Sequence, residues 1–124
     1  MRRQLTVILT VLLAFGTVHA AQQPHFADVP AKDHARQNPL AGKPDATTAG
    51  SSLYRDHCAE CHLADAQGDG KKKPSLRSAE VHSATDGDLE WFLRQGDLRH
   101  GMPSWSNLTQ SQRWAIINYL RSLH

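Results

Sequence analysis

The sequence predicts an all-α fold of three to four short helices, and three observations support this. Thr85 with Asp88, and Thr109 with Gln112, have the spacing of a helix N-cap and the side chain that completes a capping box. After the second pair, apolar residues recur at helical spacing, at positions 115, 116, 119, 120 and 123. No stretch alternates convincingly between apolar and polar residues, as a half-buried strand would.

The expected helices follow in order along the chain. The first begins at Ser51 or Ser52, since a serine hydroxyl can cap a helix N-terminus. The second begins at Thr85 and ends at Gly96, because glycine is favoured just beyond a last helical turn. The third begins at Thr109. The first helix carries four residues at near-helical spacing: Leu53, Tyr54, Cys58 and Cys61.

Length and charge narrow the class of protein. The chain has 124 residues, enough for one ordinary domain. Its formal net charge of +2 is far from the basicity of a nucleic-acid binder. Two cysteines are too few for a disulfide-dense scaffold, and no second apolar run is long enough for a membrane helix. We therefore expect no nucleic acid as partner and no stable membrane span in the mature chain.

Residues 1–20 have the pattern of a secretory signal peptide. Two arginines precede an apolar stretch from Leu5 to Val18, and Ala20 marks the expected cleavage site. A retained anchor is the alternative, but the stretch is shorter than the roughly 20 apolar residues of a spanning helix. Removal of Arg2 and Arg3 would leave equal numbers of basic and acidic residues. The mature chain is expected to be formally neutral and periplasmic.

The rest of the chain is predicted to have two parts, a proline-rich flexible leader over 21–49 and a folded domain over 50–124. Four prolines, at 24, 30, 39 and 44, interrupt any regular period in the leader. A single domain below about 80 residues rarely builds a sufficient core without a disulfide, a metal or a cofactor. The sequence therefore predicts that something besides the apolar side chains contributes to this fold.

The central motif is Cys58-Ala59-Glu60-Cys61-His62, and three kinds of site compete for it. A thiol–disulfide centre usually lies at a helix start within a βαβ pattern, and no strand is predicted here. A zinc site needs four ligands, but no further cysteine exists and the other histidines are dispersed. C-x-x-C-H is a direct signal of covalent haem attachment, in which the thiols bond the porphyrin and the histidine binds the iron.

Met102 is the expected second axial ligand, because it is the only internal methionine. It lies in a loop bounded by glycine and proline between two predicted helices, not on an apolar helical face. His100 and His82 are rival ligands that the sequence leaves open. A His/Met pair raises the reduction potential. Because it also fills both axial positions, it favours electron transfer over catalysis at the iron.

With these motifs the chain resembles the small class I c-type cytochromes, which carry a single haem in a cytochrome c fold. The resemblance covers residues 50–124. It rests on Gly50, Tyr54, the C-x-x-C-H motif, Pro74-Ser75-Leu76, Gly101-Met102-Pro103 and Ile117-Asn118-Tyr119-Leu120. It implies an electron carrier rather than an enzyme, with one covalent haem c wrapped by the helices.

The resemblance also implies roles for residues around the haem. Gly50 and Tyr54 would let the first helix cross the last one closely, opposite Tyr119. The Pro74 carbonyl would accept a hydrogen bond from Nδ1 of His62 and so fix the ring and its tautomer.

Further residues have two interpretations each. Trp91 and Trp105 would pack on the haem or donate to a propionate, with ordinary core packing as the alternative. Arg77, Arg94 and Arg99 would neutralise propionates or lie solvated at the surface.

The predicted function is a monomeric periplasmic electron carrier between a dehydrogenase and a downstream cytochrome or oxidase. Lys71, Lys72 and Lys73 form a positive cluster, either a solvated loop or a docking patch for an acidic redox partner. The segment from Trp91 to Trp105 resembles cytochromes that accompany periplasmic dehydrogenases. An accessory subunit of one dehydrogenase complex, and a haem-free thiol or metal protein, are the alternatives.

Overall fold

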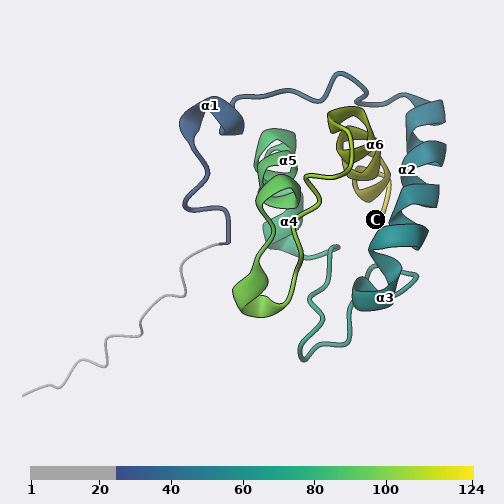
Figure 1. Cartoon of the computed structure of the whole chain (residues 1–124). Coiled ribbons are helices and arrows are strands. Elements are labelled where there is room, and N and C mark those ends of the chain that lie inside the picture. The colour runs from purple at the N-terminus through teal and green to yellow at the C-terminus, as the bar shows by residue number, and fades with distance from the viewer. Residues whose placement is uncertain (1–24) are drawn as a thin grey trace, which may run out of the picture.

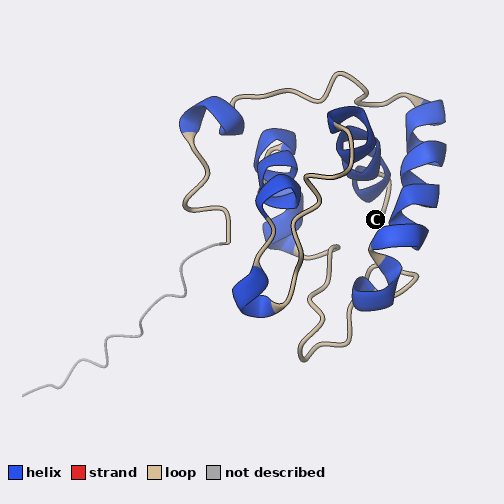
Figure 2. Cartoon of the chain, in the orientation of Figure 1, coloured by secondary structure: helices blue, strands red, loops and turns tan. Residues whose placement is uncertain are grey.

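The computed structural model describes residues 25–124, so the predicted signal peptide lies outside the described residues. Within residues 25–124, six α-helices and one 3-10 turn follow one another (Figure 1): α1 (Ala31–His34), α2 (Pro44–His57), α3 (Ala59–His62), α4 (Ala79–Ser83), α5 (Asp86–Gln95), η1 (Leu98–His100) and α6 (Gln110–Arg121). The described residues contain no strand (Figure 2), and only Asp97 and Met102 form an isolated β-bridge. The all-α prediction is confirmed.

Local signals placed two of the three longer helices correctly. Thr85 caps α5 and Thr109 caps α6, each in a complete capping box with the third helical residue. Gly96 follows the last residue of α5 with a φ of +71°. No helix of the described residues is long and apolar enough to cross a membrane.

Within the described residues, the most extensive contact between helices is that of α2 with α6. A Cβ on Gly50 would lie 1.9 Å from the Ala115 carbonyl oxygen, so only glycine permits this approach. Beside it, the rings of Tyr54 and Tyr119 pack with their centroids 5.3 Å apart. The contact expected between the first and last helices is therefore present.

The segment before α2 corrects the sequence-based prediction. Described residues 25–43 are not a flexible, extended leader: Asn38 is buried and donates to the Trp114 carbonyl at 3.0 Å. The segment crosses the ends of α5 and α6 between α1 and α2 (Figure 1). Pro44 begins α2, where a missing N–H breaks no helical bond, so the predicted boundary at residue 50 falls inside this helix. Proline spacing alone did not reveal these long-range contacts.

The core connects the helices to the C-x-x-C-H motif. Tyr54, Ile116 and Ile117 are fully buried at its centre. Cys58 belongs to the same cluster, and Met102 and Trp105 pack against it as partly buried members. Residues from the motif and from the methionine loop therefore share one apolar cluster.

Candidate haem site

The C-x-x-C-H motif lies at a break between two helices. α2 ends at His57, and the Cys58 N–H still donates to the Tyr54 carbonyl at 2.8 Å. The Cys58 carbonyl then accepts the first bonds of α3, from the N–H groups of Cys61 and His62. This single turn leaves Cys58 buried and Cys61 exposed.

The buried thiol is a poor nucleophile in the protein described here. Burial, with a smaller contribution from the nearby Cys61 thiol, raises the pKa of Cys58 to about 11. Thiol–disulfide exchange needs a thiolate, whose formation requires a lowered pKa. The environment of Cys58 therefore does not favour the redox-thiol alternative.

His62 is held in one tautomer. Its ring is buried, and Nδ1 lies 3.0 Å from the Pro74 carbonyl oxygen. A carbonyl only accepts, so Nδ1 must carry the proton and Nε2 keeps its lone pair. This is the arrangement that the resemblance implied, and it is the one that metal-binding histidines use.

The loop that supplies Pro74 is itself tied to the motif. The Gly68 N–H donates to the His62 carbonyl at 3.1 Å, and the Leu76 N–H donates to the Ala66 carbonyl at 2.9 Å. The Tyr54 hydroxyl donates to the Leu63 carbonyl at 2.7 Å, which anchors the chain directly after His62. Sequence reasoning assigned Tyr54 to helix packing and missed this second contact.

The methionine loop folds back on the end of α5. Asp97 and Met102 exchange two backbone hydrogen bonds of 2.8 and 2.9 Å. A Cβ on Gly96 would lie 2.5 Å from the Ser104 nitrogen, so this return depends on glycine. Met102 is consequently half-buried against the core cluster rather than free in solvent.

The two predicted tryptophans differ in their surroundings. Trp105 packs against the core, and its ring centroid lies 5.1 Å from that of His57, next to Cys58. This contact brings the methionine loop beside the start of the motif. Trp91 is half-buried on α5 and is not part of the cluster formed by the described core residues.

The residues that the sequence offered as other ligands of the iron or as partners of the propionates are exposed or have other partners. His100 is exposed, and its Nδ1 lies 2.6 Å from an Asp97 carboxylate oxygen. His82 is exposed on α4. Arg94 donates to Asp33 at 2.7 Å, so it is committed to a carboxylate of the protein itself. A zinc site would require at least three grouped His, Cys, Asp or Glu side chains. Residues 25–124 contain no such group.

The three lysines form a turn around a carboxylate that the sequence analysis did not single out. Asp69 Oδ1 accepts the backbone N–H groups of Lys71, Lys72 and Lys73 at 2.9 to 3.1 Å. These hydrogen bonds, chiefly that from Lys73, lower the pKa of Asp69. The Lys73 ammonium donates to the Glu60 carbonyl at 3.2 Å, which places the turn beside α3.

Comparison with known proteins decides the family. Residues 45–120 match the family model described as cytochrome c oxidase, cbb3-type, subunit III. The chain belongs to this family of c-type cytochromes. Cytochrome c550 of Pseudomonas aeruginosa is 36% identical to it over 95 residues, covering 71% of this chain and 63% of the relative.

A solved structure agrees with this assignment. Cytochrome cL of the marine methylotrophic bacterium Methylophaga aminisulfidivorans has a TM-score of 0.60 and 29% identity. The match covers 69% of this chain and 60% of that one, so the chain spans about three fifths of each of these relatives. The predicted resemblance to small c-type cytochromes and the cytochrome c fold are confirmed.

The family implies haem c and electron transfer rather than catalysis. The donor groups of this chain fit that cofactor. Two thiols lie one helical turn apart, one histidine has its Nε2 lone pair available, and one thioether packs against the same apolar cluster. In c-type cytochromes, imidazole and thioether ligate the iron, and the cysteine thiols of a C-x-x-C-H motif attach the porphyrin.

Proposed function

We propose that the chain is a periplasmic electron carrier that binds one haem c through Cys58 and Cys61, with His62 and Met102 as axial ligands. The observation that supports it best is the hydrogen bond from Nδ1 of His62 to the Pro74 carbonyl, because His62 directly follows the second cysteine. This hydrogen bond keeps the proton on Nδ1 and so leaves Nε2 to bind a metal. The family match supports the cofactor, and the residue roles are our proposal.

Each residue would contribute one function. The thiols of Cys58 and Cys61 would attach the haem through two thioether bonds. Pro74 keeps the His62 ring oriented, and Met102 supplies a soft sulfur ligand. Bound haem supplies reversible one-electron chemistry. Because His62 and Met102 would both bind the iron, they would leave no iron position open for a substrate.

Absorption spectroscopy of the purified protein tests the haem assignment. We expect c-type Soret and α bands that survive acid–acetone extraction, because two thioether bonds hold the porphyrin. Absence of these bands would contradict the proposal. The single variants Cys58→Ala and Cys61→Ala should each leave one thioether, which shifts the α band of the pyridine adduct.

The identity of the second ligand is tested separately. Ferric iron bound to a thioether gives a weak long-wavelength charge-transfer band, which Met102→Ala should abolish. His100→Ala and His82→Ala are matched controls and should retain the band. A band that persists in Met102→Ala would overturn the assignment of Met102.

The lysine turn is proposed as the docking patch for an acidic redox partner. Its contact with Glu60 places it beside the turn that carries Cys61 and His62. Electron transfer requires close approach to the redox centre, and complementary charge raises the rate of encounter. A monomeric carrier between a dehydrogenase and a cytochrome or oxidase would use such a patch for transient contacts.

A fixed subunit of a larger enzyme is the second candidate, because the matching family model is described as an oxidase subunit. Gel filtration of the periplasmic fraction distinguishes the two. A carrier should elute at the mass of a monomer, whereas a subunit should elute with its enzyme at much higher mass.

A further inference from the structure

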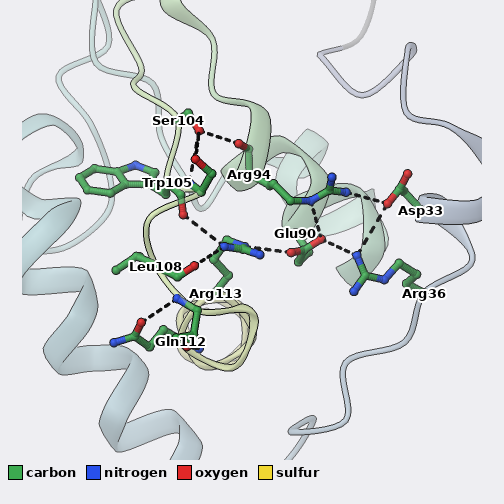
Figure 3. A network of polar contacts seen from close by, with 11 residues as sticks. Asp33, Arg36, Glu90, Arg94, Ser104, Trp105, Leu108, Gln112 and Arg113 are labelled. Atoms are coloured by element: carbon green, nitrogen blue, oxygen red, sulfur yellow. Dashed lines mark hydrogen bonds and ion pairs between the residues drawn. The ribbon is translucent and has the colours of Figure 1, made fainter.

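A cluster of charged side chains surrounds Glu90, a carboxylate on α5 with no exposed surface (Figure 3). Arg113 of α6 donates to it through Nε at 2.9 Å. Arg36, from the segment before α2, donates at 2.8 Å, and Arg94 Nε lies 3.6 Å away. A second carboxylate, Asp33, accepts from Arg94 at 2.7 Å.

This cluster is stable only as a unit. A buried carboxylate is costly unless charged donors surround it, and removing one partner leaves the other charge uncompensated. Both carboxylate oxygens of Glu90 accept from guanidinium groups, one from Arg113 and one from Arg36. The charge of Glu90 therefore determines where these arginines point.

Arg113 links the cluster to the chain beyond Met102. Its Nη1 donates to the carbonyl oxygens of Trp105, at 3.3 Å, and of Leu108 (Figure 3). The backbone N–H of Trp105 donates to the Leu93 carbonyl at 2.8 Å. Trp105 is thus held by α5 through its N–H and by α6 through its carbonyl.

The same arrangement confines Met102 from both sides. On the N-terminal side, the β-bridge joins Met102 to Asp97. On the C-terminal side, the Ser104 hydroxyl donates to the Arg94 carbonyl at 2.6 Å, and Trp105 is anchored as described. Only Pro103 separates Met102 from this second anchor.

We propose that Glu90 is a positioning residue for Met102. It orients Arg113, which holds the segment 105–108 and thereby fixes the methionine loop against the core. Among the arginines that pair with Glu90 in the described residues, Arg113 is the one that binds the segment 105–108. The functional meaning rests on the proposed role of Met102 as an iron ligand.

Amide hydrogen exchange in the haem-loaded protein tests the proposal. In Glu90→Gln, the N–H groups of Met102 and Trp105 should exchange about tenfold faster, relative to those of α2. Arg113→Lys should have the same local effect, because one ammonium cannot serve Glu90 and two carbonyls together. This second variant keeps the test open if Glu90→Gln does not fold.

Asn118→Ala is the matched control. Asn118 is also a buried polar residue of α6, but it binds the backbone of Gly42 and Lys43 and not the methionine loop. In this variant, the amide exchange rates of Met102 and Trp105 should rise no more than those of the rest of the protein. The proposal would be overturned if amide exchange in Glu90→Gln became equally faster throughout the protein, or if exchange at Met102 and Trp105 did not become faster at all.

The rate at which added imidazole displaces Met102 from the iron tests whether the stability of the loop affects ligand binding. Imidazole should replace the native ligand about tenfold faster in Glu90→Gln than in Asn118→Ala, because the loop opens more often. If the unmodified protein lacks the thioether charge-transfer band, the ligand assignment fails. The exchange of the two loop amides then still decides whether Glu90 positions the loop.

Discussion

At the scale of single residues, small groups set the chemistry of the site. One carbonyl, that of Pro74, determines which nitrogen of His62 carries the proton. One missing side chain, at Gly50, allows α2 and α6 to approach until a Cβ would overlap the Ala115 carbonyl. Both effects depend on distances of a few ångströms, so a single substitution should have a measurable effect on stability or on the site.

Gly50→Ala should destabilise the protein by at least about 2 kcal/mol, because the helix crossing must open to admit a methyl group. The free energy of unfolding from denaturant titration measures this. Ser52→Ala, at an exposed position of the same helix, is the control and should change stability by less than about 0.5 kcal/mol. Equal stability of the two variants would show that α2 and α6 are not in such close contact.

At the scale of elements, short segments are held by groups far away in the sequence. The turn of lysines 71–73 is fixed by Asp69 and by the contact with Glu60. The N-terminal segment is fixed on α4 by Glu80, which accepts the backbone N–H of His25 at 2.8 Å. Each contact yields an electrostatic prediction.

The lysine turn should control the rate of reaction with anionic partners. In Lys71→Gln with Lys72→Gln, electron exchange with ferricyanide should be slower and less sensitive to added salt, because the local positive potential is reduced. Stopped-flow measurement over a range of ionic strength checks this. Lys32→Gln on α1, which lies across the molecule from α3 in Figure 1, should change the rate much less.

Glu80 should contribute to stability only above acidic pH. Hydrogen bonds from His25, first from its backbone N–H, lower the pKa of Glu80 below its ordinary value of 4.5. A lowered carboxyl pKa stabilises the folded state above pH 4.5, and this stabilisation is lost as the pH falls through the lowered value.

Glu80→Gln should therefore be less stable than the unmodified protein at pH 7, by less than about 1 kcal/mol for a partly exposed pair. The two proteins should converge as the pH falls well below 4.5. Denaturant titration at several pH values measures the difference. Asp56→Asn, at an exposed position of α2, should show no such convergence. A constant difference at all pH values would contradict the prediction.

At the scale of the whole molecule, one apolar cluster joins the helices, the C-x-x-C-H turn and the methionine loop. Small domains gain much of their stability from the cofactor around which they pack, since ligands that bind only the folded state stabilise it. Folding and cofactor attachment should therefore be coupled in this chain.

The double variant Cys58→Ala, Cys61→Ala should lose covalent haem and much of its helical structure. Far-UV circular dichroism of the purified, haem-free chain measures the loss. Cys61→Ala alone is the control, because Cys58 can still form one thioether. A double variant with unchanged helix content and a cooperative unfolding transition would show that the protein part folds by itself.

Local sequence patterns were sufficient for much of the fold and for the proposed haem-binding residues. The capping boxes of α5 and α6 depend on residues three positions apart, which the sequence displays directly. The C-x-x-C-H spacing likewise lies within one turn. The hydrogen bond from His62 to Pro74 was expected from the resemblance.

Contacts between distant residues were not visible in the sequence. The prolines before α2 suggested a flexible leader, whereas Arg36 and Asn38 bind groups on α5 and α6. Glu90, which the sequence analysis did not single out, is completely buried. The sequence by itself determined α5, α6 and the C-x-x-C-H motif, because those depend on near neighbours. Only the tertiary structure decided what holds the methionine loop, because the burial of one charge depends on groups from three separate segments.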